Sequence, residues 1–130
     1  MDEIDLEILK ILKDDARAKY VDIARRVKLT EGAVRRRVKN LVKEGVIRRF
    51  TIETSVEFEG IVLIKTEPTQ TDRTRRMVER VADRVFEVSG DYDIAAHIQA
   101  YTMEELNRKV DEIRGLPLVL DTNTLIKLRD

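Results

Sequence analysis

Residues 20–43 read YVDIARRVKLTEGAVRRRVKNLVK, and this stretch decides the N-terminal fold. It holds two apolar stripes at helical spacing, separated by the pair Leu29-Thr30. The first stripe predicts a short helix over 20–27. Thr30 is a good N-cap for a second helix, which we expect to end near Gly45. The apolar positions of the two helices are Tyr20, Ile23, Ala24 and Val27, then Val34, Val38, Leu41 and Val42. The stretch therefore predicts two helices joined by a tight turn.

A third helix is predicted upstream, over residues 3–14. Its apolar face consists of Ile4, Ile8, Ile11 and Leu12, and Asp2 is placed to cap its first turn. Three short helices within 45 residues, the last two joined by a tight turn, have the geometry of a helix-turn-helix unit.

Residues 46–53 are rich in Ile, Phe and Thr and predict a strand that leaves the helical unit, as in winged-helix proteins. Residues 57–60 separate this strand from a new apolar run that begins at Ile61. We therefore expect a domain boundary near 54–60.

The remaining residues predict two strand-helix-strand halves. The first half comprises strand 61–67, a helix over 72–84 with Met77, Val78, Val81 and Val85 inward, and strand 85–89. The second comprises strand 93–100, a helix with a capping box at Thr102 and Glu105 that stops at Gly115 and Pro117, and strand 118–128. The order βαββαβ predicts a ferredoxin-like sandwich with helices on one sheet face. The predicted fold class is thus α+β, with a winged-helix-like helix-turn-helix domain at 1–46, a connecting strand and linker at 47–60, and a βαββαβ domain at 61–130.

The net charge of zero conceals two opposite halves. Residues 1–50 hold 14 basic and 9 acidic side chains, whereas residues 51–130 hold 11 and 16. Residues 16–50 alone hold 12 basic and 3 acidic side chains, a net charge of +9. Such a basic stretch on a helix-turn-helix predicts binding to a polyanion, and double-stranded DNA is the partner that this geometry suits.

With Val34, Val38 and Leu41 facing the core, Gly32, Arg36, Lys39 and Lys43 point outward on the last helix, and Arg35 and Arg37 flank them. The alternative is a solvated charged helix without a partner, which the independent agreement of helix spacing, cap and charge disfavours. We predict the following DNA-binding residues: Tyr20, Thr30, Gly32, Arg35, Arg36, Lys39, Lys43, Arg48 and Arg49.

Several segments together resemble the Lrp/AsnC family of feast/famine regulators, archaeal members above all. They are residues 2–9, 23–27, 29–38 and 41–47 in the helical part, and 88–93, Leu116-Pro117 and 121–124 in the C-terminal part. The resemblance spans nearly the whole chain and implies a sequence-specific transcription regulator. Residues 54–60 depart from it, because the family's longer linker with a Pro and a Leu-Gly pair is absent. Dimer geometry is therefore not carried over.

The resemblance also implies an effector site at contacts between dimers, formed here by Ser89, Gly90, Asp91, Tyr92, Asp93, Thr122 and Thr124. Gly90 allows close approach of a ligand, carboxylates accept from an ammonium group, and threonine hydroxyls bind either group. The alternative is an ordinary Gly-Asp turn beside β-favouring threonines. The acidic residues near this site favour a basic or polar amino acid, such as lysine, arginine or glutamine, as the effector.

We expect the uncovered sheet face to pair two chains into a homodimer, with tetramers or octamers built from it. No enzyme is predicted: the single histidine, His97, reads as structural, there is no phosphate-binding loop, and neither a cofactor nor a metal is expected. Absence of an apolar span predicts a cytoplasmic protein that does not enter membranes. Two alternatives stay open, a nonspecific architectural DNA-binding protein and a small-molecule enzyme with a DNA-binding arm.

Overall fold

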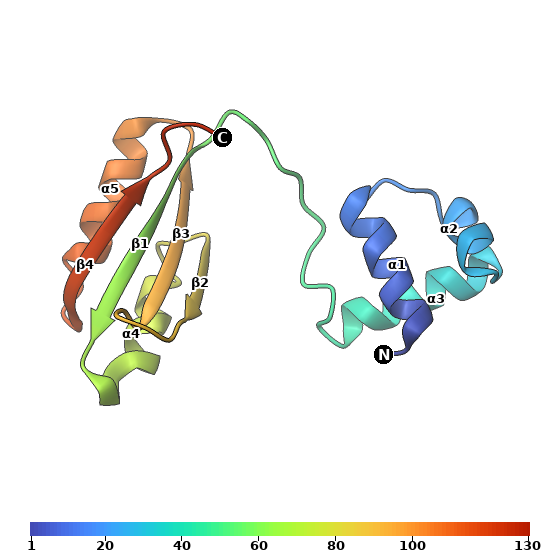
Figure 1. Cartoon of the computed structure of the whole chain (residues 1–130), viewed down its shortest axis with the longest axis horizontal. Helices are drawn as coiled ribbons and strands as arrows, with labels where there is room; N and C mark the ends of the chain where they lie inside the picture. Colours follow the sequence, from blue (N-terminus) through green and yellow to red (C-terminus); the bar gives the residue numbers. More distant parts are fainter. The chain divides into compact units, whose positions relative to one another are not determined.

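The computed structural model describes residues 1–130 and divides into two compact units, Met1–Glu53 and Thr54–Asp130 (Figure 1). The first unit is entirely helical. The second contains one sheet and two α-helices. None of the helices combines the length and the apolar character that a membrane span requires.

The first unit consists of α1 (Glu3–Asp14), α2 (Tyr20–Val27) and α3 (Glu31–Lys43), which confirms the three predicted helices. Asp2 caps α1 and Thr30 caps α3 with their side chains. The helices enclose one small core, made of Ile8, Ile11, Leu12, Ile23, Ala24, Val34 and Val38.

Lys28 forms the turn between α2 and α3, with φ 60° and ψ 44° in the left-handed region. It is the only non-glycine residue with positive φ. The backbone N–H groups of Lys28 and Leu29 both donate to the carbonyl oxygen of Ala24, the second at 3.0 Å. This closed turn fixes where α3 begins relative to α2.

The strand predicted over 46–53 is not formed in the structure of the single chain. Ile47 packs against the helical core, and its N–H donates to the carbonyl oxygen of Leu41 at 3.0 Å. Beyond it, Phe50 is 55% and Ile52 81% exposed. The residue types favour a strand, but a strand needs a neighbour to satisfy its backbone groups, and no other segment of this chain pairs with residues 46–53.

The second unit has the predicted βαββαβ order. Its strands are β1 (Phe58–Thr66), β2 (Arg84–Glu87), β3 (Ile94–Ala100) and β4 (Val119–Ile126), and its helices are α4 (Thr71–Val78), preceded by the 3₁₀ turn η1 (Pro68–Gln70), and α5 (Met103–Arg114). The antiparallel sheet has the order β2-β3-β1-β4, and Figure 1 shows α4 and α5 on the same side of it. Residues from both helices and from alternate strand positions form the core, including Val62, Ile64, Val78, Ile94, Ile98, Leu106 and Ile113. The ferredoxin-like prediction is confirmed.

Two predicted boundaries were wrong. Strand β1 begins at Phe58, not at 61, so Gly60 is a buried strand residue and not part of a linker. Helix α4 ends at Val78, not at 84, because residues 84–87 pair with β3. Val85 thus packs against the core from strand β2. Its distance along the sequence from Val78 and Val81 also fits helical spacing, which explains the wrong prediction. At α5, Thr102 accepts from the N–H of Glu105 at 3.1 Å, which is one half of the predicted capping box.

Candidate nucleic-acid interface and ligand region

The outer face of α3 carries a row of cationic side chains beside a glycine. Arg36, Lys39 and Lys43 are exposed, and a Cβ built at Gly32 would meet no atom within 4 Å. Thr30 starts this helix by accepting from the N–H of Ala33 at 3.1 Å. The row is therefore accessible along the whole helix, as contact with a DNA groove requires.

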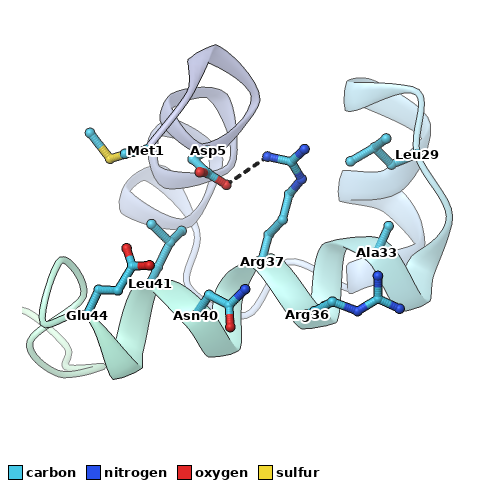
Figure 2. A pocket seen from close by; sticks show the side chains of 9 residues that line it. All are labelled: Met1, Asp5, Leu29, Ala33, Arg36, Arg37, Asn40, Leu41 and Glu44. Carbon is cyan, nitrogen blue, oxygen red and sulfur yellow. Dashed lines mark hydrogen bonds and ion pairs between the residues drawn. The ribbon is translucent and has the colours of Figure 1, made fainter.

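The three consecutive arginines of α3 have three different surroundings. Arg35 donates to Glu31 at 2.8 Å, and its guanidinium lies 5.5 Å from the centre of the Tyr20 ring. Arg36 takes part in none of the unit's ion pairs. Arg37 turns toward α1 and binds Asp2 and Asp5, as Figure 2 shows for Asp5. Of the run, Arg36 is thus the arginine that is free to meet a partner.

A hollow of about 360 Å³ lies between the start of α1 and α3 (Figure 2). In Figure 2, Arg36 lies along α3 while Arg37 reaches between the helices. The hollow mixes cationic, acidic and apolar side chains and is open to solvent: Met1, Asp5, Leu29, Ala33, Arg36, Arg37, Asn40, Leu41 and Glu44. Such a lining suits a contact surface better than an enclosing small-molecule site.

Arg48 and Arg49 are exposed in the irregular segment after α3. Tyr20 opens α2 and is half-buried beneath Arg35. Tyr20, Thr30, Arg35 and the α3 row therefore belong to one helical unit. Arg48 and Arg49 follow it without a strand to orient them.

The predicted effector loop is fastened to the end of β1. The N–H of Asp93 donates to the carbonyl oxygen of Ile64 at 2.9 Å, and the N–H of Thr66 donates to the Asp93 carboxylate at 2.8 Å. Lys65 Nζ donates to the carbonyl oxygen of Asp91 at 3.2 Å. Gly90 has φ 131°, which an L residue rarely adopts. One carboxylate oxygen of Asp93 is thus already engaged, and Ser89 and Asp91 are exposed.

Thr122 and Thr124 share one side of β4, as predicted. They pair with Ile64 and Val62 of β1 and lie in phase with Ile126, which packs against the core, so their side is the helix side of the sheet. The loop 89–93 and Thr122 flank opposite sides of the same end of β1, roughly 10 Å apart at two strand spacings. One chain therefore brings the loop and Thr122 to one end of the sheet, with Thr124 opposite the middle of β1, without joining them into a closed pocket.

The face of the sheet opposite the helices has an apolar middle and polar ends. Its middle residues are Ile61, Leu63, Phe86, Ala95 and Leu125, of which Ile61, Phe86 and Leu125 are 42%, 48% and 50% exposed. At one end Glu59 accepts from Lys127 at 2.5 Å, Gln99 at 2.9 Å and lies 3.0 Å from Nε2 of His97. These hydrogen bonds, that of Lys127 first, lower the pKa of Glu59 to about 2.

Three functional features escaped the sequence patterns. Arg37 was predicted on a flank of α3, but its long-range partners lie 35 and 32 residues away in the sequence. Lys65 and the Glu59 cluster depend on strand register, which no local motif reveals. The pair Asp2 and Asp5, spaced as a capping box, was the available signal for the anchor of Arg37. No group of three His, Cys, Asp or Glu side chains is arranged to hold a metal ion.

Comparison with known proteins identifies both units. Residues 1–48 match the family described as winged helix-turn-helix DNA-binding, and residues 59–130 match the Lrp/AsnC ligand binding domain. The HTH-type transcriptional regulator LysM of Sulfurisphaera tokodaii is 41% identical, over 99% of this chain and 96% of the relative. The regulator FL11 of Pyrococcus abyssi is 34% identical, over 99% and 90%.

Among solved structures, a feast or famine regulatory protein from M. tuberculosis complexed with L-methionine aligns with a TM-score of 0.78. The two chains are 23% identical, and the alignment covers 99% of this chain and 92% of that structure. At this identity the likeness shows a shared fold alone. The ligand-domain match alone takes in more than half of the residues, and relatives named as transcriptional regulators align from end to end. The chain is therefore a member of the Lrp/AsnC family of transcription regulators, with an N-terminal helix-turn-helix DNA-binding unit and a C-terminal ligand-binding domain.

Proposed function

We propose that α3 reads base edges in the major groove through Arg36 and Lys39, with Gly32 allowing close approach and Lys43 contacting phosphate. The observation that carries this proposal is the exposed row on α3, whose cations have no acidic partner within the unit. Tyr20, Thr30, Arg35, Arg48 and Arg49 complete the proposed surface. Arg35 is already held by Glu31, so we expect it to contribute mainly through shape.

The test measures the DNA affinity of Arg36→Ala, Lys39→Ala and the double variant at fixed salt. One DNA is a fragment from the promoter of the protein's own gene, and the other has a random sequence. Loss of a base contact lowers specific binding by about 1–3 kcal/mol and does so unevenly across operator variants. Lys10→Ala, which removes an exposed cation from α1, is the matched control. Unchanged operator affinity in the double variant would refute the assignment of α3, and equal wild-type affinity for both DNAs would favour a nonspecific architectural protein.

We infer that two chains pair through the open sheet face. Ile61, Phe86 and Leu125 are apolar and exposed there, and contact with a second copy removes their surface from water. We expect Ile61→Asp to shift the full chain toward monomer in light scattering at micromolar concentration. Leu128→Asp, which alters a 93% exposed residue of the C-terminal tail, is the control. A dimer undisturbed by Ile61→Asp, or a monomeric wild type, would overturn this part. Tetramers and octamers built from the dimer remain part of the same proposal.

The ligand of the second unit is, we propose, a free amino acid bound near residues 89–93 and the threonines of β4. The carboxylates of Asp91 and Asp93 suit its ammonium group, and the hydroxyls of Thr122 and Thr124 suit either polar group. Glu87, Asp91, Asp93 and Asp121 favour a basic or polar side chain. Because Thr122 and the loop flank β1 at some distance in one chain, a contacting copy is expected to complete the site.

Calorimetry against all twenty amino acids tests this proposal, repeated on Gly90→Val and on the double variant Thr122→Val with Thr124→Val. We expect one class of amino acid to bind and both changes to weaken its binding, whereas Thr51→Val in the irregular segment after α3 leaves binding intact. Linkage requires operator DNA to change the affinity for the ligand by the same factor as the ligand changes the affinity for DNA. No binder at millimolar concentration, or turnover of the ligand, would remove the sensor proposal.

A further inference from the structure

The longest-range polar contact of the helical unit joins the end of one helix to the middle of another. Nη1 of Arg37 lies 2.9 and 2.7 Å from the two carboxylate oxygens of Asp2 and 3.1 Å from Oδ1 of Asp5. One guanidinium nitrogen therefore bridges the first turn of α1 to α3 (Figure 2). The side chains of Arg37 and Asp5 are 29% and 15% exposed, so this contact is better shielded than the other ion pairs of the unit.

The two carboxylates are themselves fixed. The N–H of Asp5 donates to Oδ1 of Asp2 at 2.8 Å, and the N–H of Asp2 donates to Oδ2 of Asp5 at 3.2 Å. This reciprocal capping box ties both side chains to the backbone of α1. The hydrogen bond from Arg37 lowers the pKa of Asp2, and Asp2 raises the pKa of Arg37, so each of these two groups favours the charged form of the other. Arg37 thus grips a rigid part of α1.

Apolar packing between α1 and α3 is non-directional, because it depends on the area removed from water. A charge-assisted hydrogen bond, in contrast, has a preferred direction and length. The bridge from Arg37 therefore restricts the rotation and sliding of α3 over the small helical core. Arg36 stands next to Arg37 on the same helix, so rotation or sliding of α3 also moves the outward row of Arg36, Lys39 and Lys43.

We propose that Arg37 is a positioning residue for DNA recognition: held by Asp2 and Asp5, it sets the orientation of α3 from which Arg36 and its neighbours meet the bases, and it does not itself contact DNA. The inference rests on the proposed DNA-binding role of α3. It divides the run Arg35-Arg36-Arg37 by function, although the three residues are identical and adjacent.

The test compares Arg37→Gln and Arg37→Lys with Arg36→Gln and Lys43→Gln in the full chain. Affinity is measured on the promoter fragment and on random DNA across a series of salt concentrations. Arg36→Gln removes a proposed base contact and is expected to relax discrimination between operator variants, whereas Lys43→Gln removes the proposed phosphate contact and is expected to reduce the slope of log affinity against log salt by about 1. Arg37→Gln is expected to leave that slope unchanged while lowering the affinity for the promoter fragment about fivefold or more, and the affinity for random DNA much less. Arg37→Lys restores the charge, but the lysine side chain is one atom shorter than the path to Nη1 of arginine, and it therefore restores little of the bridge to Asp2 and Asp5.

A change on the other side of the bridge gives a prediction of opposite sign. Asp5→Ala removes a negative charge from the DNA-binding unit, which by charge alone would strengthen binding. Positioning predicts weaker and less specific binding instead. Glu3→Ala is the matched control, since Glu3 is an exposed acid of the same first turn without a partner among the unit's ion pairs. Circular dichroism at the assay temperature establishes that each variant is folded.

Three results would overturn the proposal: a salt slope reduced by Arg37→Gln as much as by Lys43→Gln, recovery in Arg37→Lys, or tighter binding of Asp5→Ala to the promoter fragment. If Arg36→Gln itself has no effect, the assignment of α3 fails and not the bridge alone. If Arg37→Gln and Asp5→Ala match the wild type while Arg36→Gln is impaired, only the positioning role is refuted.

Discussion

Replacing Gly60 by alanine is expected to destabilise the second unit. A Cβ at this position would lie 3.1 Å from Cδ1 of Ile126, 3.1 Å from the carbonyl oxygen of Leu125 and 3.6 Å from Cγ1 of Ile98. The Leu125 oxygen belongs to β4, which is paired to β1 at this point, so it has little freedom to withdraw. Overpacking of this kind costs about 1–3 kcal/mol, and the lower entropy of the unfolded alanine chain offsets about 0.4–1 kcal/mol of it. The midpoints of these ranges leave a net loss of about 1 kcal/mol.

The assay is urea denaturation of the full chain, followed by hydrogen exchange of peptides from each unit. For a unit of this size the loss corresponds to a fall in Tm of roughly 4–8 °C for each kcal/mol. Gly115→Ala is the control within the same unit, because a Cβ there meets its nearest backbone oxygen at 3.4 Å, an ordinary contact, without a positive φ. An unchanged or higher urea midpoint for Gly60→Ala would show that β4 shifts to make room for the added Cβ. The reasoning from close contact would then be refuted.

Three further changes separate other contributions. Lys28→Gly should raise the free energy of unfolding of the helical unit by about 0.5–1 kcal/mol in urea titrations, because glycine adopts the left-handed turn without steric penalty. Thr30→Ala should lower it by about 1 kcal/mol, since the N–H of Ala33 loses its acceptor, with Thr30→Ser as the rescue. The pKa of Glu59, held at about 2 chiefly by Lys127, lies below its unfolded value of 4.5. Its stabilising contribution is therefore present above about pH 4.5 and lost as the pH falls toward about 2, a slope that Glu59→Gln should remove from stability measured across this range.

The helical unit could be predicted almost to the residue. Asp2 and Thr30 mark helix starts with their side chains, and each helix buries one regular stripe, so local signals and packing agree. In residues 46–53 they disagree. Phe50 and Ile52 favour a strand, but pairing is a property of two segments, and a single segment's composition does not supply the second.

The errors in the second unit have the same origin. Gly60 looks like a linker residue because glycine weakens strands, yet here it permits close approach of β4. Val85 continues the helical spacing of Val78 and Val81, but pairing with β3 takes it into β2. For the DNA surface, the outward row of α3 follows from helical geometry alone. Arg37 does not, because its partners are brought near only by the packing of α1 on α3.

Strand β1 serves two surfaces at once. At its end, Thr66 is buried on the helix side and donates to Asp93, while the next residue inward, Lys65, is exposed on the opposite face and donates to Asp91. Farther along the strand, Ile61 and Leu63 lie in the middle of the open face. A rigid, centrally placed strand transmits a displacement of one end along its length. If a ligand binds loop 89–93 and two chains pair through the open face, as proposed, β1 alone connects the ligand site to the dimer contact.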